Sequence, residues 1–597
     1  MARKFLPAVV VIFLFVNACV SLPDSQPVDR VVHLDQNWKD PSTANYFHHT
    51  SQGTRILPRD WFMALEQPEL SFFGDPSMFH ETEYLSRFGF IPDTEKTPYN
   101  PDGLPLGFAV DDEFVDPMTN KKSPVVGLTC AACHTGELHV VKDGKRLAVR
   151  IEGGPAMMDP GLFQDALSKA IAYTYYVPGR FDRFARKVLK EHYSEENAEQ
   201  LHATLKNIIE AGKKMNAVND ELHLYDVKGG FSRTDALGRI LNVVFGEQLN
   251  VANLAPASAP VNFPFIWDAS WFDWVQYNGS IHQPMVRNAG EALGVRAPAN
   301  FKQREALYKS TVRVDNLAKL ERWLAGDPKI PLSGLSSPKW PENILGTIDR
   351  DLAKRGEALY EQEGVDCQGC HLPPMDQIRK EWQNPSSPYW THRYGPPLLR
   401  LVLKNVDYIK TDRTLLENFN NRKVVQPDAL QDAPGFIPIK KGMGMGLALG
   451  DVVENVVNRW YDDQQPPTPA AVRKEMNGGR KNLIRAPMGY KARPLNGIWA
   501  TAPFLHNGSV PNLYELLSPV DERSKTFFLG SKEFDPVKIG FSTQPLTDGF
   551  EFDVSSKGNF NSGHEFNGDG KELGNGVIGR KLSHDERMAL IEYLKTL

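Results

Sequence analysis

Two copies of one short motif restrict this chain more than any other feature of its sequence. They are Cys130-Ala131-Ala132-Cys133-His134 and Cys367-Gln368-Gly369-Cys370-His371. In each copy two thiols lie about one helical turn apart, and a histidine follows at once. This spacing is typical of covalent haem attachment, because each thiol can add to a haem vinyl group and the adjacent imidazole can bind the iron. The sequence therefore predicts two haem c groups, with His134 and His371 as iron ligands.

Neither a redox thiol pair nor a zinc site fits the two motifs as well. A redox Cys-x-x-Cys pair does not need the histidine. A structural zinc site usually has its two cysteine pairs close together in one domain, whereas these motifs lie more than a third of the chain apart. Cys19 is the remaining cysteine, so we expect no disulfide framework.

Residues 1–19 have the form of an export signal, which agrees with haem attachment outside the cytoplasm. Arg3 and Lys4 precede the apolar run 5–16, and small residues lead to Cys19. The run is too short to span a bilayer comfortably, which favours cleavage. Two modes of cleavage stay open: ordinary processing after Ala18, or a lipobox that places a lipid on Cys19. We expect a periplasmic or secreted protein, with a lipid anchor in the outer membrane as the alternative.

The length of 597 residues exceeds a single ordinary core. We expect a mainly α fold with two cytochrome c-like haem domains, long loops and little β structure. The domains are predicted at 35–330 and 345–597, joined by a linker marked by Pro331 and Pro338. The net charge of -5 and the lack of a long basic run argue against nucleic acid as a partner.

Helical patterns place the two motifs within these domains. Helical stretches near 160–176 and 181–215 look like an insertion in the N-terminal domain. In the C-terminal domain a helix at 351–363 precedes the second motif, and Gly356 offers a close-packing position. Ser583 and Glu586 form a capping box at the start of the last helix. We expect these two helices to cross.

Several local stretches resemble the dihaem peroxidase superfamily, and within it the rubber-oxygenase-like dihaem oxygenases. That branch includes bacterial rubber oxygenases and periplasmic fatty acid dioxygenases and diol synthases that act on oleate. Besides both haem motifs, the stretches are Arg233-Thr-Asp-Ala-Leu-Gly238, Phe265-Ile-Trp267, Trp274-Val-Gln-Tyr-Asn-Gly279, Arg287-Asn-Ala-Gly-Glu-Ala-Leu-Gly-Val295, Leu495-Asn-Gly-Ile-Trp-Ala-Thr-Ala-Pro-Phe-Leu-His-Asn-Gly-Ser-Val-Pro511 and Gly563-His564-Glu565-Phe566.

The resemblance implies different roles for the two haems. The N-terminal haem, held by His134, meets oxygen or peroxide. The C-terminal haem, held by His371, is six-coordinate and serves electron transfer. Its second ligand comes from downstream, where His564 and His506 are the candidates. The Gly-His-Glu-Phe context favours His564, and His506 would then contact a propionate or bridge the haems. The resemblance also allows a calcium ion between the domains.

An aromatic segment between the motifs is the candidate wall of the N-terminal haem pocket. Besides Phe272 it contains Trp267, Trp271, Trp274 and Tyr277. Such residues often form a packed core instead, so both interpretations stay open. His282 and Glu291 could supply an acid/base pair for O–O cleavage. Asn278 and Arg287 are candidates for contacts with haem propionates.

Three functions from different classes remain at this point. The favoured one is an oxygenase that adds O2 to a carbon–carbon double bond of an unsaturated lipid. A fatty acid such as oleate, giving a hydroperoxide or diol, is preferred to polyisoprene. The second is a dihaem cytochrome c peroxidase that takes electrons from a redox partner. The third is an electron carrier without catalysis, for which the chain is unusually long.

Overall fold

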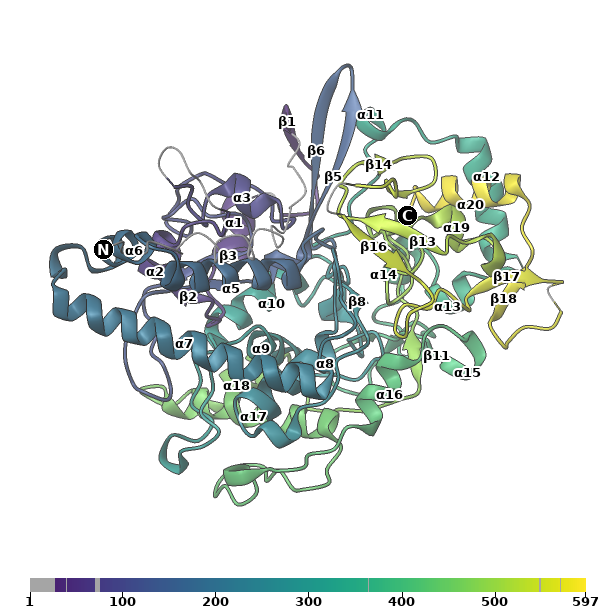
Figure 1. The fold of residues 1–597 in the computed structure, drawn as a ribbon. Coiled ribbons are helices and arrows are strands. Elements are labelled where there is room, and N and C mark those ends of the chain that lie inside the picture. The colour runs from purple at the N-terminus through teal and green to yellow at the C-terminus, as the bar shows by residue number, and fades with distance from the viewer. Residues whose placement is uncertain (1–26, 39, 70–75, 363, 547–548, 570) are drawn as a thin grey trace.

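The computed structural model describes residues 27–38, 40–69, 76–362, 364–546, 549–569 and 571–597 (Figure 1). The export signal and Cys19 lie outside the described residues. No helix within these ranges is both long and apolar enough to cross a bilayer.

Helices make up most of the regular structure. Their bounds are α1 (Pro41–His49), α2 (Arg59–Ala64), α3 (Thr82–Ser86), α4 (Ala131–His134), α5 (Pro160–Tyr176), α6 (Arg180–Leu189), α7 (Glu195–Leu222), α8 (Ala236–Leu241), α9 (Pro284–Gly294), α10 (Val314–Ala325), α11 (Glu342–Leu345), α12 (Arg350–Glu361), α13 (Gln368–His371), α14 (Met375–Lys380), α15 (Val406–Ile409), α16 (Thr414–Asn421), α17 (Met445–Asp463), α18 (Ala470–Met476), α19 (Leu513–Leu516) and α20 (His584–Leu594).

The strands are short and form small separate sheets. Their bounds are β1 (Arg30–His33), β2 (Leu57–Pro58), β3 (Phe108–Asp111), β4 (Val125–Leu128), β5 (Thr135–Lys142), β6 (Lys145–Glu152), β7 (Arg233–Thr234), β8 (Val261–Asn262), β9 (Trp390–Thr391), β10 (Leu398–Leu399), β11 (Leu403–Asn405), β12 (Gly489–Lys491), β13 (Thr526–Leu529), β14 (Phe534–Asp535), β15 (Gly540–Phe541), β16 (Phe550–Asp553), β17 (Glu565–Gly568) and β18 (Val577–Arg580). The three-stranded sheets have the orders β1-β6-β5 and β2-β4-β3.

The first haem motif lies between two of these sheets. Strand β4 ends just before Cys130, the motif forms α4, and β5 begins directly after His134. β5 and β6 are joined at Asp143 and Gly144, which both have positive φ, as a tight hairpin turn requires. Figure 1 shows this hairpin rising between the N-terminal helices and the C-terminal strands. The backbone N–H of His139 on β5 donates to the carbonyl of Lys532 at 2.7 Å, which ties the hairpin to the C-terminal region.

The expected helices on either side of the second motif are present and cross each other. In α20 the Ser583 and Glu586 side chains form the expected capping box. Gly356 of α12 lies at the crossing, where an added Cβ would be 2.0 Å from the carbonyl oxygen of Ala589. Glycine is therefore required at that position for the helices to approach so closely.

The second helical stretch of the expected insertion is divided. α6 ends at Leu189, and a 3-10 turn at Lys190–His192 separates it from α7. Ser194 begins α7, since its hydroxyl accepts from the backbone N–H of Asn197 at 3.1 Å. The division therefore follows from a capping residue within the stretch.

The main apolar clusters draw on both sides of the expected linker. The first contains α8–α10 residues such as Met285 together with α17 residues such as Val453. The second joins β5–β6 residues to Tyr360 and to the C-terminal helix. The linker itself is packed, because Leu332 and Leu335 are each only 1% exposed. Chain segments far apart in sequence thus share their cores.

Candidate haem sites

The first motif presents its histidine in the form that binds a metal. Cys130 precedes the single turn of α4, which carries Cys133 and His134. Close packing against this turn needs Gly107, where a Cβ would be 2.4 Å from the Cα of Ala132. The Nδ1 of His134 donates to the carbonyl oxygen of Pro264 at 2.8 Å. The hydrogen bond fixes the ring and leaves the lone pair of Nε2 for a metal ion.

The ring of His134 is neutral and partly buried. Burial, followed by the charges of Arg493 and Arg287, lowers the pKa of His134 to about 4. Burial likewise raises the pKa of Cys130 and of Cys133 to about 12. All three motif side chains nevertheless keep part of their surface accessible. The three side chains are therefore not sealed from a group bound beside them.

The second motif repeats this arrangement. Cys367 precedes α13, which carries Cys370 and His371. The Nδ1 of His371 donates to the carbonyl oxygen of Arg493 at 2.7 Å. Burial lowers the pKa of His371, so this imidazole is also neutral with a free Nε2.

The two sites differ in what faces the motif histidine. The rings of His371 and His564 have centroids 6.1 Å apart. Two imidazoles on opposite sides of one metal ion have centroids about 6.2 Å apart, because each nitrogen lies about 2.0 Å from the metal and about 1.1 Å from its ring centroid. Among the described residues, no imidazole makes a comparable ring contact with His134.

His564 is held in place by its backbone. Its φ is 47°, a left-handed conformation that is uncommon for a residue other than glycine. Its backbone N–H donates to the carbonyl of Ile409 at 3.1 Å, and its own carbonyl accepts from Arg523 at 2.9 Å. Burial lowers the pKa of His564 to about 3.

His506 has different neighbours. Its ring stacks on Tyr490 with centroids 3.9 Å apart and meets the edge of Tyr277 at 6.2 Å. Burial lowers the pKa of His506 to about 3. The structure thus brings His564, and not His506, against the ring of His371.

Three of the four aromatic candidates belong to different packing clusters. Trp267 stacks on Phe265 at 4.4 Å and belongs to the cluster around the C-terminal helix. Trp271 packs in the α9–α17 cluster, and its indole N–H donates to the carbonyl of Ala325 at 2.8 Å. These two indoles are satisfied core residues.

Trp274 lies beside polar groups, whereas Tyr277 packs against an apolar cluster. The ring of Trp274 lies 3.9 Å below the guanidinium of Arg485 and 5.3 Å from the ring of His282. Tyr277 packs beside the α16 cluster, and burial raises its pKa to about 12. Among the four candidates, Trp274 is thus the one shown beside a cation and an imidazole.

Among the proposed polar groups, Glu291 lies near the first motif, and its Oε1 accepts from Nε2 of Gln276 at 3.3 Å. Its charge contributes to the raised pKa of both Cys130 and Cys133, and burial raises the pKa of Glu291 itself. The Nδ1 of His282 instead donates to the carbonyl of Asp273 at 2.6 Å. A buried carboxyl group close to the attachment cysteines can hold a proton there.

The other two polar candidates differ in their contacts. Arg287 is ion-paired with Glu321. Asn278 is fully buried with both amide atoms lacking a partner among the described groups. Orphaned buried polar atoms at this place fit a polar group of a bound cofactor or a water.

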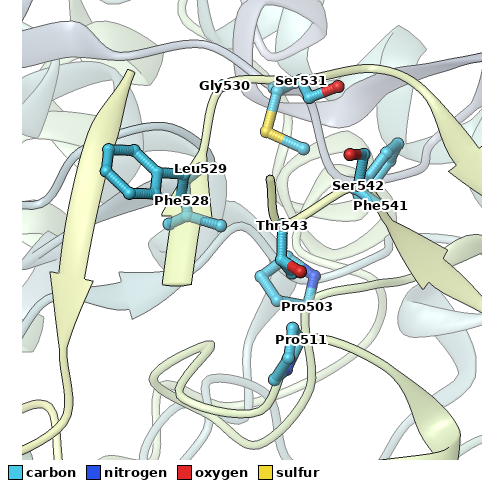
Figure 2. Close-up of a pocket in the computed structure, with 10 residues that line it drawn as sticks. Pro503, Pro511, Phe528, Leu529, Gly530, Ser531, Phe541, Ser542 and Thr543 are labelled. Atoms are coloured by element: carbon cyan, nitrogen blue, oxygen red, sulfur yellow. The ribbon is translucent and has the colours of Figure 1, made fainter. Parts of the chain in front are cut away.

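The cavity in Figure 2 is not a substrate chamber. It lies between β13, β15 and the segment 503–511, and has a volume of about 10 Å³. Such a volume holds about one water molecule at most. A larger cavity of about 290 Å³ borders Leu372, next to the second motif.

No cluster of three or more His, Cys, Asp or Glu side chains is gathered for a metal ion within the described ranges. The calcium ion therefore stays a prediction from resemblance. The residues that fit a haem are the two thiol pairs with neutral, oriented imidazoles. Sequence reasoning missed the carbonyl groups of Pro264 and Arg493, because every residue type carries one.

Comparisons with known proteins agree with a cytochrome. Residues 489–528 match the family described as RoxA-like, cytochrome c-like. The chain is 45% identical over 599 residues to "Uncharacterized protein y4iJ" of Sinorhizobium fredii (strain NBRC 101917 / NGR234), covering 97% of this chain and 95% of that protein. It is 38% identical over 358 residues to "Uncharacterized protein y4iM" of the same strain, covering 58% of this chain and 66% of that protein.

These comparisons indicate the class of protein and show one family to which the chain belongs. The RoxA-like match implies haem c and supports a haem oxidoreductase of the rubber-oxygenase-like branch. The chain belongs to the same family as the y4iJ protein.

Proposed function

We propose that this chain is an exported dihaem oxygenase that adds O2 to a carbon–carbon double bond of an unsaturated lipid. The favoured substrate is a fatty acid such as oleate, with a hydroperoxide or diol as product. Polyisoprene is the alternative substrate within the same chemistry. The RoxA-like match supports the branch, and the substrate rests on the resemblance of the local motifs.

The observation that carries the proposal is the asymmetry of the two histidines. His371 faces His564 across the distance that one iron requires, whereas no described imidazole faces His134 in this way. A haem held at His134 would supply an iron with an accessible position for a small ligand such as dioxygen. His371 and His564 would hold the second haem together, and a haem held by two imidazoles would suit electron transfer.

The chain's own residues prepare the first site. Pro264 accepts the Nδ1 proton of His134 and so keeps Nε2 directed at the bound group. Glu291 can hold a proton near the attachment cysteines, since burial raises the pKa of its carboxyl group.

Location and anchoring belong to the same proposal. We infer export to the periplasm or the medium from residues 1–19, with lipidation of Cys19 as the anchored alternative. An extracytoplasmic site suits a substrate that is too apolar to import freely. Mass measurement of the mature N-terminus distinguishes the two forms.

Glu291 also supports the second candidate, a dihaem peroxidase. A protonated carboxyl group near the first haem could assist O–O cleavage with electrons from a redox partner. The non-catalytic carrier would need both irons to be closed to small ligands, and the surroundings of His134 do not favour this.

The test uses the purified holoprotein with both haems attached. Spectra are recorded with and without O2, peroxide and oleate, and products are identified by mass spectrometry. We expect oxygenated product from oleate and O2 without an electron donor. Stearate is the matched control, because it has the same carboxylate and chain length but no double bond.

Three different results would select the alternative functions. Turnover only with peroxide and a reduced cytochrome or quinol would favour the peroxidase. Cleavage of polyisoprene with no product from oleate would reassign the substrate. Failure of both irons to bind any small ligand would leave the carrier.

A further inference from the structure

Three cationic side chains of the segment 485–493 lie partly buried near one another, without an ion pair. Arg485 donates from Nε to the carbonyl of Gly279 at 2.7 Å. Lys491 donates from Nζ to the carbonyl of Trp274 at 3.2 Å. The guanidinium of Arg493 lies 3.5 Å from the centre of the Phe265 ring. Within the described part of the chain, none of the three cations has a carboxylate oxygen within 4.0 Å.

These cations repel one another in a place of low polarity. Burial, then the charge of Arg493, and further the charges of Arg287 and Arg485, lower the pKa of Lys491. Asp273 opposes this shift, but its own pKa is raised by burial. Partly buried charges without a counter-charge are costly, so a cluster of this kind indicates an anion that balances it.

A second observation at the same place is the set of unpartnered polar atoms. The Nε of Arg493 is buried and has no described hydrogen-bond partner, and Asn278 is fully buried with both amide atoms unpaired. The backbone places Asn278 next to the cluster. The N–H of Lys491 donates to the carbonyl of Tyr277, the residue before Asn278, at 2.8 Å. Donors therefore remain available for a ligand here.

The cluster lies between the two haem motifs. The carbonyl of Arg493 accepts from His371 at 2.7 Å, and the charge of Arg493 also lowers the pKa of His134. Lys491 and Arg493 keep part of their surface accessible. Arg493 is thus related to both motif histidines, and the cluster is not sealed from a ligand.

We propose that Arg485, Lys491 and Arg493 form a carboxylate-binding site between the two haem-attachment motifs. Guanidinium and ammonium groups are the usual partners of carboxylates, and the planar guanidinium can donate two parallel hydrogen bonds. The carboxylate comes from a haem propionate or from a fatty acid substrate. The inference rests on the proposed function, because both sources belong to it.

The test replaces Lys491 by Met in the holoprotein. The matched control is Lys404→Met on β11, whose ammonium group lies over Tyr408 at 5.2 Å, outside the cluster. Three quantities are measured: unfolding stability, the reduction potentials of both haems, and affinity for oleate compared with oleyl alcohol. Covalent haem is scored separately by mass, and its absence would contradict the proposed function rather than these measurements.

If the carboxylate is a propionate, Lys491→Met lowers stability and at least one reduction potential, because a nearby cation disfavours ferric haem. A tenfold change in the one-electron equilibrium corresponds to about 59 mV. If the carboxylate is that of the substrate, both potentials stay unchanged and oleate affinity falls at least tenfold while oleyl alcohol affinity does not.

The proposal is overturned if Lys491→Met raises stability and leaves the potentials and the oleate affinity unchanged. That result would show an uncompensated buried cation, which an apolar side chain improves. Arg485→Gln is the second variant if Lys491→Met fails to fold. It keeps a donor for Gly279 and removes the charge, and the same outcomes apply.

Discussion

At the residue scale, the clearest expectation concerns His564. We expect His564→Ala to convert the haem at His371 from a six-coordinate to a five-coordinate form, because the facing imidazole is removed. Absorption and electron paramagnetic resonance spectra would show loss of one low-spin signal. His506→Phe is the control, since a phenyl ring keeps the stacking on Tyr490. Loss of the low-spin signal in the His506 variant instead would reverse the assignment.

Asp268 gives a second residue-scale prediction, on pH. Burial raises the pKa of this carboxyl group to about 6, above its unfolded value of 3.8. The protonated side chain therefore stabilises the folded protein. This contribution is fully present below pH 3.8 and is lost as the pH rises through 6. Asp268→Asn should stabilise the protein by up to about 3 kcal/mol at pH 8 and much less at pH 4.

Denaturant unfolding at the two pH values measures the effect of Asp268→Asn. Asparagine suits the site, because φ is 60° there and the side chain can still accept from Asn496. Equal effects at both pH values would show that folding does not raise the pKa of Asp268.

The same residues show what sequence can and cannot predict. His134 and His371 were predictable because thiol spacing and an adjacent imidazole are a chemical signature. His564 depended on a resemblance of four residues. The carbonyls of Pro264 and Arg493, which orient the two ligands, carry no signal in residue type. The cluster of Lys491 and Arg493 depends on tertiary burial, which a charged residue in sequence does not reveal.

At the scale of elements, the crossing of α12 and α20 can be tested with two glycines. Gly356→Ala would place a Cβ 2.0 Å from the carbonyl of Ala589, so the helices would have to separate. We expect a loss of about 2–4 kcal/mol. Gly212→Ala in α7 is the matched control, because nothing lies within 4 Å of its Cβ. It should gain up to about 1 kcal/mol from helix propensity alone.

Thermal or urea unfolding of both variants measures this difference. If Gly356→Ala left the stability unchanged, the helices would not touch at that position.

Elements such as α20 were predictable because the capping box and the apolar spacing agree. The division of α6 from α7 also had a signal in Ser194, which periodicity alone does not detect. The segment 265–277 has little regular structure, so its periodicity could not show that Trp267 and Trp271 enter different clusters.

At the scale of the whole molecule, the apolar clusters make the two halves depend on each other. α9 packs on α17, although they come from opposite sides of the segment 331–338. Tyr360 shares a second cluster with Val149 of β6. We therefore expect residues 345–597 expressed alone to expose much of these faces and to lack a cooperative unfolding transition, although the second haem motif lies within that range.

The second experiment for this prediction is co-expression of the fragments 27–338 and 339–597. Because burial of apolar surface drives association as it drives folding, the two fragments should recover a joint complex with both haems. Size-exclusion chromatography, haem stain and thermal unfolding measure the outcome. A 345–597 fragment that binds haem and unfolds cooperatively by itself would show that the shared clusters are an interface between independent domains. The sequence pattern alone suggests two independent domains. It locates the two haem motifs, but it does not show which distant residues pack around each of them.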